Sequence, residues 1–208
     1  MRIVLLLPRQ TLTGTSKPGL SGRFSTATCY CASADSMRHP TTRDVQEIID
    51  LAKAIKLFDS NDEIDELIRQ PLEDYVAQGT ESASSKSQWW IAHADAPTDS
   101  PIDSSGGSVH RDIACASFTG PQPEEPGAFN MYFIGVRPEM QKKGLGARMV
   151  AKVEEWAQGQ QGVRLLVETA SHMEGAQAFY KKLGYTERKR MKDMYGEGVD
   201  AVQYVKEL

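Results

Sequence analysis

The sequence predicts a mixed α/β fold in which four helices flank a central sheet of six or seven strands. Helical and strand-like patterns alternate along the chain in the order helix, helix, three strands, helix, strand, helix and two strands. The strand-like segments are short, rich in β-branched and aromatic residues, and bounded by turn-forming residues. Elements in such an order bury their apolar sides by packing helices against the faces of one sheet.

Two helices open the predicted domain. Residues 41–57 have apolar side chains at helical spacing, and Thr41 or Thr42 can cap this helix. Residues 62–78 repeat the helical pattern. We expect Pro71 to break or kink this second helix, because proline lacks the amide proton and clashes with the preceding turn.

Three strands follow, at residues 88–94, 113–119 and 129–136. The third is apolar on both faces, so we expect it near the centre of the sheet. Residues 95–108 are rich in Asp, Pro, Ser and Gly and therefore predict a loop between the first two strands.

The C-terminal part predicts a helix and a buried strand, then a second helix and two short strands. The first helix, the buried strand and the two last strands are expected at residues 143–158, 163–169, 185–191 and 201–206. Ser171 and Glu174 match a capping box, so we expect the second helix to begin there.

The N-terminal segment differs in composition from the rest of the chain. Residues 1–34 contain no Asp or Glu, but they include four Arg or Lys and nine Ser or Thr. This composition is typical of a mitochondrial or plastid transit peptide, and an ordinary disordered tail of a cytoplasmic protein is the alternative. We therefore expect a disordered organelle-targeting segment at residues 1–35 and one folded domain at residues 36–208.

Charge and cysteine content exclude several classes of function. Residues 35–208 hold 20 basic and 28 acidic side chains, so we expect no nucleic-acid partner. No apolar run approaches the roughly 20 residues of a membrane span, so we expect no membrane partner either. Cys29 and Cys31 lack a second Cys or His cluster nearby, and we therefore predict no metal site.

The junction between residues 129–136 and 143–158 is the most informative part of the sequence. A buried strand ends there, Pro138 turns the chain, and a glycine-rich segment from Gln141 to Ala147 opens the long helix. The first turn of a helix has amide protons without partners, and the helix dipole gives them partial positive charge. A pyrophosphate can bind there, and Gly144 and Gly146 would allow a close approach to the backbone.

The alternatives for this junction are a Walker loop, a dinucleotide-binding loop and a simple tight turn. The Walker pattern is absent from the sequence. The dinucleotide pattern requires a third glycine at the position of Met149. A tight turn remains an alternative, although the neighbouring Gln and two Lys favour a phosphate-binding role.

Two motifs in this region resemble those of the GNAT acetyltransferase superfamily. Residues 136–146 are similar to its acetyl-CoA signature, Gln/Arg-x-x-Gly-x-Gly/Ala, and residues 178–185 are similar to its closing Tyr-x-x-x-Gly-Phe/Tyr motif. The resemblance covers residues 36–208 and implies a mostly antiparallel sheet. It also implies an N-acetyltransferase that moves the acetyl group of acetyl-CoA directly to a primary amine, such as a protein N-terminus, a lysine or a small amine.

The resemblance assigns the acetyl-CoA site to the strand end and the glycine-rich segment. Backbone groups of the strand would bind the pantetheine arm, and backbone amides of the segment would bind the pyrophosphate. The residues implied are Ile134, Gly135, Val136, Gln141, Lys142, Lys143, Gly144, Leu145, Gly146 and Ala147.

The resemblance also implies two catalytic residues. Tyr180 takes the position of the general acid that protonates the leaving thiolate, although its helical spacing also suits an apolar core position. Glu168 lies on a strand twelve residues earlier and is the candidate base, although a strand carboxylate can also be a paired structural group. His172 is a second and weaker candidate base.

Three further features bear on substrate and activity. Tyr195 would belong to a loop over the acceptor, with ordinary hairpin packing as the alternative. The acidic residues 59–66 could favour a cationic amine or simply stabilise a helix N-terminus. Met173 replaces the Asn that family members often have, so a catalytically inactive acetyl-CoA sensor or scaffold is the alternative function.

Overall fold

The computed structural model describes residues 37–55, 61–79, 87–94 and 112–208. The described residues form a seven-stranded sheet with the strand order β1-β2-β3-β4-β5-β7-β6. The bounds of the first four strands are Met37–Arg38, Gln88–His93, Ile113–Pro121 and Ala128–Val136. Those of β5, β6 and β7 are Arg164–Ala170, Thr186–Met191 and Ala201–Glu207. All strand pairs are antiparallel except β4 with β5, which confirms the predicted mixed sheet.

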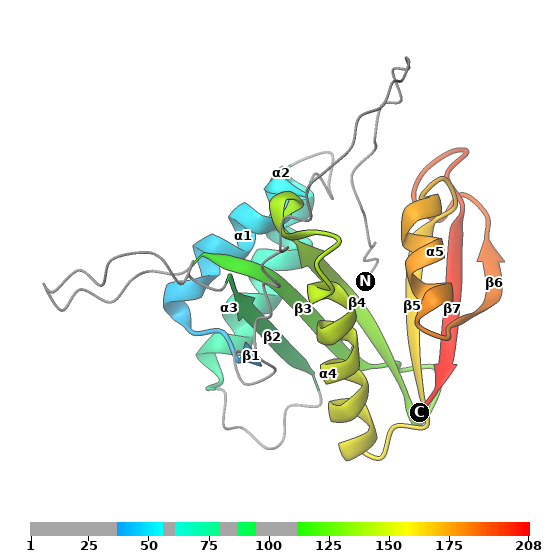
Figure 1. The fold of residues 1–208 in the computed structure, drawn as a ribbon, viewed down its shortest axis with the longest axis horizontal. Helices are drawn as coiled ribbons and strands as arrows, with labels where there is room; N and C mark the ends of the chain where they lie inside the picture. Colours follow the sequence, from blue (N-terminus) through cyan, green and yellow to red (C-terminus); the bar gives the residue numbers. More distant parts are fainter. Residues whose placement is uncertain (1–36, 56–60, 80–86, 95–111) are drawn as a thin grey trace, which may run out of the picture.

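One face of β2, β3 and β4 is covered by the N-terminal helices. They are a short 3₁₀ turn η2 (Thr42–Asp44), α1 (Val45–Ala54), α2 (Asn61–Ile64), a π-helical turn η3 (Asp65–Arg69) and α3 (Gln70–Ala77). Their apolar sides form one buried cluster with Trp89, Ile91 and Phe133 of the sheet. Figure 1 shows these helices together behind the β2–β4 half of the sheet.

The opposite face is covered by α4 (Leu145–Gly159) and α5 (Glu174–Lys182). A 3₁₀ turn η4 (Pro138–Met140) connects β4 to α4. The apolar sides of α4 and α5 form a second buried cluster, which includes Met131, Val167 and Tyr204 from three strands. The sheet therefore separates two cores, and successive side chains along a strand point alternately into one core and the other.

The pairing between β4 and β5 covers only part of each strand. Their register runs from Ala128 opposite Arg164 to Met131 opposite Val167 and ends there. β4 pairs with β3 up to Val136 and β5 pairs with β7 up to Ala170, so both strands continue beyond the point where they part. Figure 1 shows the two strands diverging toward the end of the sheet at which α4 and α5 begin.

The predicted elements are found with small shifts, and one strand was not predicted. The strand β1 has only two residues, too few for a periodic signal. Pro71 does not end its helix, because the π turn before it changes the hydrogen-bond pattern and leaves the proline in the first turn of α3. The targeting segment and the loop at 95–108 lie outside the described residues, so both stay predictions.

The predicted capping box at Ser171 and Glu174 is wrong. The helix α5 begins at Glu174, and Met173 is its N-cap residue. The amide of Ser171 instead donates to the carbonyl of Asp200, at 2.8 Å, so this residue extends the sheet beyond β5. A sequence match to a cap cannot exclude such competition from a distant strand.

Candidate active site

The loop that joins β4 to α4 has a strained backbone that suits an anion site. Gly144 is the N-cap of α4 and has φ 82°, a left-handed conformation that glycine adopts without a steric penalty. Lys142 also has a positive φ, of 60°. The loop thereby turns sharply into the first turn of α4, where amide protons are available to a phosphate group.

Gly146 lies where three elements approach one another. A Cβ atom at this position would be 3.4 Å from Cγ2 of Val136 on β4 and 3.5 Å from Cζ of Phe179 on α5. Both distances are ordinary van der Waals contacts, so a methyl group would fit, whereas a longer side chain would push α4 away from the end of β4 and from α5. The two glycines thus have different physical reasons, since the conformation favours glycine at Gly144 and the packing at Gly146 only requires a small residue.

The other predicted acetyl-CoA residues surround this junction. Ile134 and Gly135 are buried on β4, beyond its last pair with β5. Gln141 donates from Nε2 to the carbonyl of Val136, at 3.0 Å, and so fastens the loop to the strand end. The side chains of Lys142 and Lys143 are exposed at the rim of the loop, whereas Leu145 is buried and anchors the first turn of α4. Ala147 is half-buried in the same turn.

An ion pair that the sequence analysis missed fixes the start of this loop. Arg137 follows β4 directly, and its Nε donates to the carbonyl of Ile113 at 2.6 Å. Its guanidinium lies 3.7 Å from Glu47 of α1, and Glu47 also accepts from the amide of Ile113. Both charged side chains are mostly buried, with 19% and 14% of their surfaces exposed. No local pattern marks this pair, because its members are about 90 residues apart.

Tyr180 lies on α5 inside a group of aromatic rings. Its ring stacks on Tyr204 of β7 at 6.2 Å and meets Tyr185 at 5.5 Å. The side chain is fully buried, and its hydroxyl has no hydrogen-bond partner among the residues that the structure describes. Burial raises the pKa of Tyr180 well above its usual value, and the nearby Tyr195 raises it further. Tyr180 therefore keeps its proton through the neutral range and can give it to a stronger base.

Tyr195 comes from the loop between β6 and β7 and packs against the buried cluster that contains Tyr180. Its ring is half-buried against the core under α4 and α5. Hydrogen bonds within the loop hold its shape, including Tyr195 N to the carbonyl of Val199 at 3.0 Å and Gly198 N to Asp193 Oδ1 at 2.7 Å. The structure thus brings the predicted substrate residue and the predicted acid together.

Glu168 is the first residue of β5 beyond its last pair with β4. Its neighbour Val167 belongs to the core under α4 and α5, so Glu168 is on the opposite face of the sheet. The carboxylate is half-buried and accepts a hydrogen bond from Nε2 of Gln203, at 2.8 Å. Glu168 and Tyr180 therefore lie on opposite faces of the sheet, and each approaches the point where β4 and β5 separate.

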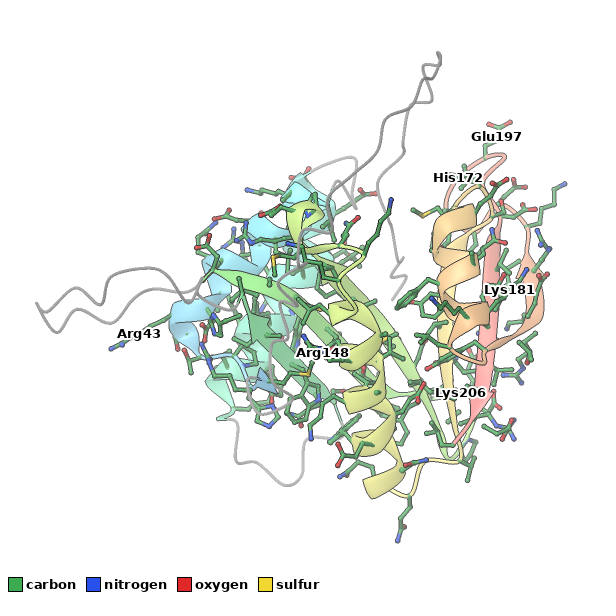
Figure 2. All side chains as sticks on the ribbon, in the orientation of Figure 1. Arg43, Arg148, His172, Lys181, Glu197 and Lys206 are labelled. Atoms are coloured by element: carbon green, nitrogen blue, oxygen red, sulfur yellow. The ribbon has the colours of Figure 1, made fainter. Side chains whose placement is uncertain are left out.

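The remaining sequence candidates lie at the end of the sheet where α5 begins. His172 is exposed, and Figure 2 shows it together with Glu197 at this end. Met173 is buried in the core beneath α5. Asp62, Glu63, Asp65 and Glu66 are exposed on α2 and η3, whereas the first residues of the predicted acidic segment lie outside the described ranges.

The described residues contain neither a metal cluster nor a spanning helix. Within these ranges, no three His, Cys, Asp or Glu side chains gather closely enough to hold a metal ion. None of the described helices has the length and apolarity to cross a membrane.

The fold and the site together define an acyltransferase class in which a sheet opens beside a phosphate-binding loop. The model of the acetyltransferase (GNAT) family matches residues 64–185, more than half of the chain. The chain therefore belongs to the GNAT acetyltransferase family, whose members use acetyl-CoA. A comparison with curated proteins finds no match.

Solved structures agree with this fold. A protein assigned to the GNAT family from Desulfovibrio desulfuricans has a TM-score of 0.67 and 21% identity, covering 82% of this chain and 97% of that one. An aminoglycoside 6′-N-acetyltransferase complexed with coenzyme A has a TM-score of 0.60 and 12% identity, and the match covers 82% of this chain and 96% of that one. A ribosomal-protein-alanine N-acetyltransferase from Brucella melitensis has a TM-score of 0.58 and 15% identity, and the match covers 83% of this chain and 99% of that one. At these identities the likeness shows the fold alone.

Proposed function

We propose that the protein transfers the acetyl group of acetyl-CoA directly to a primary amine. The observation that supports this most is the parting of β4 and β5 after Met131 and Val167, next to the Gly144 loop. The loop would bind the pyrophosphate, and the free edge of β4 at Ile134 to Val136 would bind the pantetheine arm. The thioester would then lie where the two strands part.

The two candidate catalytic groups suit the proton transfers of this reaction. Glu168 takes a proton from the acceptor ammonium, and the neutral amine then attacks the thioester carbon. A bond from nitrogen to carbon forms, the carbon–sulfur bond breaks, and the hydroxyl of Tyr180 protonates the departing thiolate. The nitrogen still holds one extra proton after the attack, and its transfer to the Tyr180 phenolate yields the amide and restores the hydroxyl. The buried hydroxyl of Tyr180 supports this role, because it has a proton to give and no hydrogen-bond partner within the described ranges.

The test is acetyl-CoA turnover by the full chain, followed as release of free thiol. Separate reactions would contain peptides with free N-termini, peptides with only lysine amines, polyamines and aminoglycosides. We expect release that depends on one of these classes, and we expect Glu168→Gln to lower kcat by about a hundredfold or more.

Glu174→Gln is the matched control, because Glu174 is an exposed carboxylate in the first turn of α5 and takes no part in the proposed chemistry. Its kcat should match that of the wild type. Calorimetric binding of acetyl-CoA without thiol release for any acceptor would contradict transfer to these amines and favour the sensor function. Absence of acetyl-CoA binding would contradict both.

A further inference from the structure

Gln203 of β7 has an unusual environment for an amide side chain. The residue is only 2% exposed and lies directly opposite Glu168 in the antiparallel pair of β5 and β7. Its Nε2 donates to Oε1 of Glu168 at 2.8 Å, whereas its own Oε1 has no hydrogen-bond partner in the described part of the chain. The amide orientation follows from charge, because the carboxylate requires a donor and would repel the amide oxygen.

Burial of this amide opposes folding, since its carbonyl oxygen has lost water without gaining a partner. An apolar side chain of similar size would avoid that cost in the same position. The gain from Gln203 is therefore local and consists of its hydrogen bond to Glu168, which fixes one carboxylate oxygen. Among the described residues, the second oxygen of Glu168 has no hydrogen-bond partner, so it is available to another group.

The surroundings offer no second donor of this kind to Glu168. Tyr132 of β4 is near enough for the Glu168 charge to raise the Tyr132 pKa, after the larger effect of burial. Its hydroxyl, however, donates to the carbonyl of Pro121 at 2.9 Å. Lys189 of β6 lies opposite Gln203 one strand farther out and is exposed. Among the described residues, Gln203 therefore makes the hydrogen bond that orients the carboxylate.

We propose that Gln203 is a positioning residue that holds the Glu168 carboxylate for proton transfer from the acceptor amine. This inference rests on the proposed function, in which Glu168 is the base. Gln203 contacts neither acetyl-CoA nor the reacting atoms in this scheme. Its effect on the reaction passes through Glu168 alone.

The test compares Gln203→Leu, Glu168→Gln and the double variant in thiol-release kinetics, with kcat and the KM for acetyl-CoA determined separately. We expect Gln203→Leu to lower kcat about tenfold, because the base has lost its orientation and one hydrogen bond. The KM for acetyl-CoA should stay within about twofold of the wild type, because Gln203 is not among the residues proposed to bind this cofactor.

The double variant separates positioning from a general structural effect. If Gln203 acts through Glu168, adding Gln203→Leu to Glu168→Gln changes kcat no further. An equal fractional loss in both backgrounds, or a Gln203→Leu variant with the wild-type kcat, would overturn the inference while leaving the proposed function intact. Wild-type activity in Glu168→Gln would overturn both, because no base would remain for Gln203 to position.

Discussion

At the scale of single residues, the buried hydroxyl of Tyr180 is the most informative feature. A phenol without a hydrogen-bond partner in the protein interior is costly, and the surrounding rings of Tyr185 and Tyr204 cannot satisfy it. The same burial that makes it costly raises its pKa, so the group is a proton donor that does not ionise at neutral pH. A raised pKa also makes Tyr180 a weaker acid, so in the proposed role its proton passes to a thiolate that forms in the same buried site, where desolvation raises the thiol pKa as well.

We therefore expect Tyr180→Phe to lower kcat by about a hundredfold, the usual range for loss of a general acid. Acetyl-CoA affinity, measured by calorimetry, should change little because the ring stays in place. Tyr204→Phe is the matched control, since Tyr204 has the same burial and stacks on Tyr180, but its hydroxyl already binds Gln177 at 3.3 Å. Equal losses in the two variants would argue against a chemical role for Tyr180.

At the scale of elements, the junction of β4 with α4 is the proposed phosphate site. Its shape depends on a left-handed residue at Gly144, on the Gln141 bond to the strand end, and on the Arg137–Glu47 pair. The first sets the conformation of the loop backbone, the second joins the loop to β4, and the third joins it to α1. The loop is therefore shaped before acetyl-CoA arrives, which reduces the entropy lost on binding.

Gly144→Ala should strain this junction, because a Cβ atom disfavours the left-handed conformation by about 1–2 kcal/mol. We expect acetyl-CoA affinity to fall about tenfold by calorimetry and the unfolding free energy to fall by about 1 kcal/mol. Nothing lies within 4 Å of the added atom, so a loss would reflect backbone conformation rather than a clash.

Gly159→Ala provides the control for this change. Gly159 is the last residue of α4, its added Cβ atom would also meet nothing within 4 Å, and its φ is not positive. This variant should bind acetyl-CoA like the wild type and be no less stable. Normal affinity in Gly144→Ala would show that the left-handed residue does not shape the phosphate site.

At the scale of the whole molecule, the sheet lies between two separate cores. Polar contacts at the edges of the sheet link its strands to the helices. One such contact links β1 to the start of α1, where Arg38 binds Asp44 through two hydrogen bonds of 2.7 and 2.8 Å. Burial alone would raise the pKa of Asp44, but the bonds from Arg38 and Thr41 outweigh it and lower this pKa to about 2.

Asp44 should therefore stabilise the protein above pH 4 and lose this effect as the pH falls toward 2. The sign follows from linkage, because the folded state binds a proton less readily than the unfolded state, in which the carboxyl has its ordinary pKa. Asp44→Asn should lower the unfolding free energy by about 1–2 kcal/mol at pH 7. Urea titrations at pH 7, 4 and 2.5 would measure this, and the difference from the wild type should shrink with each step.

Glu197→Gln is the control for this experiment, since Glu197 is an exposed carboxylate in the β6–β7 loop (Figure 2). Its unfolding free energy should follow that of the wild type at each pH. A constant difference between Asp44→Asn and the wild type down to pH 2.5 would contradict the linkage argument.

The sequence predicted the types and order of the elements well, because their signals are local. Helical spacing marked α1, α4 and α5, and the apolar run at 129–136 marked a central strand. The sequence also marked Gly144 through its place between a strand and a helix. It failed for β1, which is too short for a pattern, and for Ser171, whose amide bonds to Asp200 almost 30 residues away.

By itself, the sequence determined the class of protein, the glycine-rich loop and the candidates Glu168, Tyr180 and Tyr195. All of these follow from residues close together in the chain. Only the tertiary structure decided that β7 lies between β5 and β6, that β4 and β5 part after Val167, and that Gln203 binds Glu168 across 35 residues. The physical reason is that strand pairing depends on long-range contacts and on which face each side chain can bury, and neither is written in a local pattern.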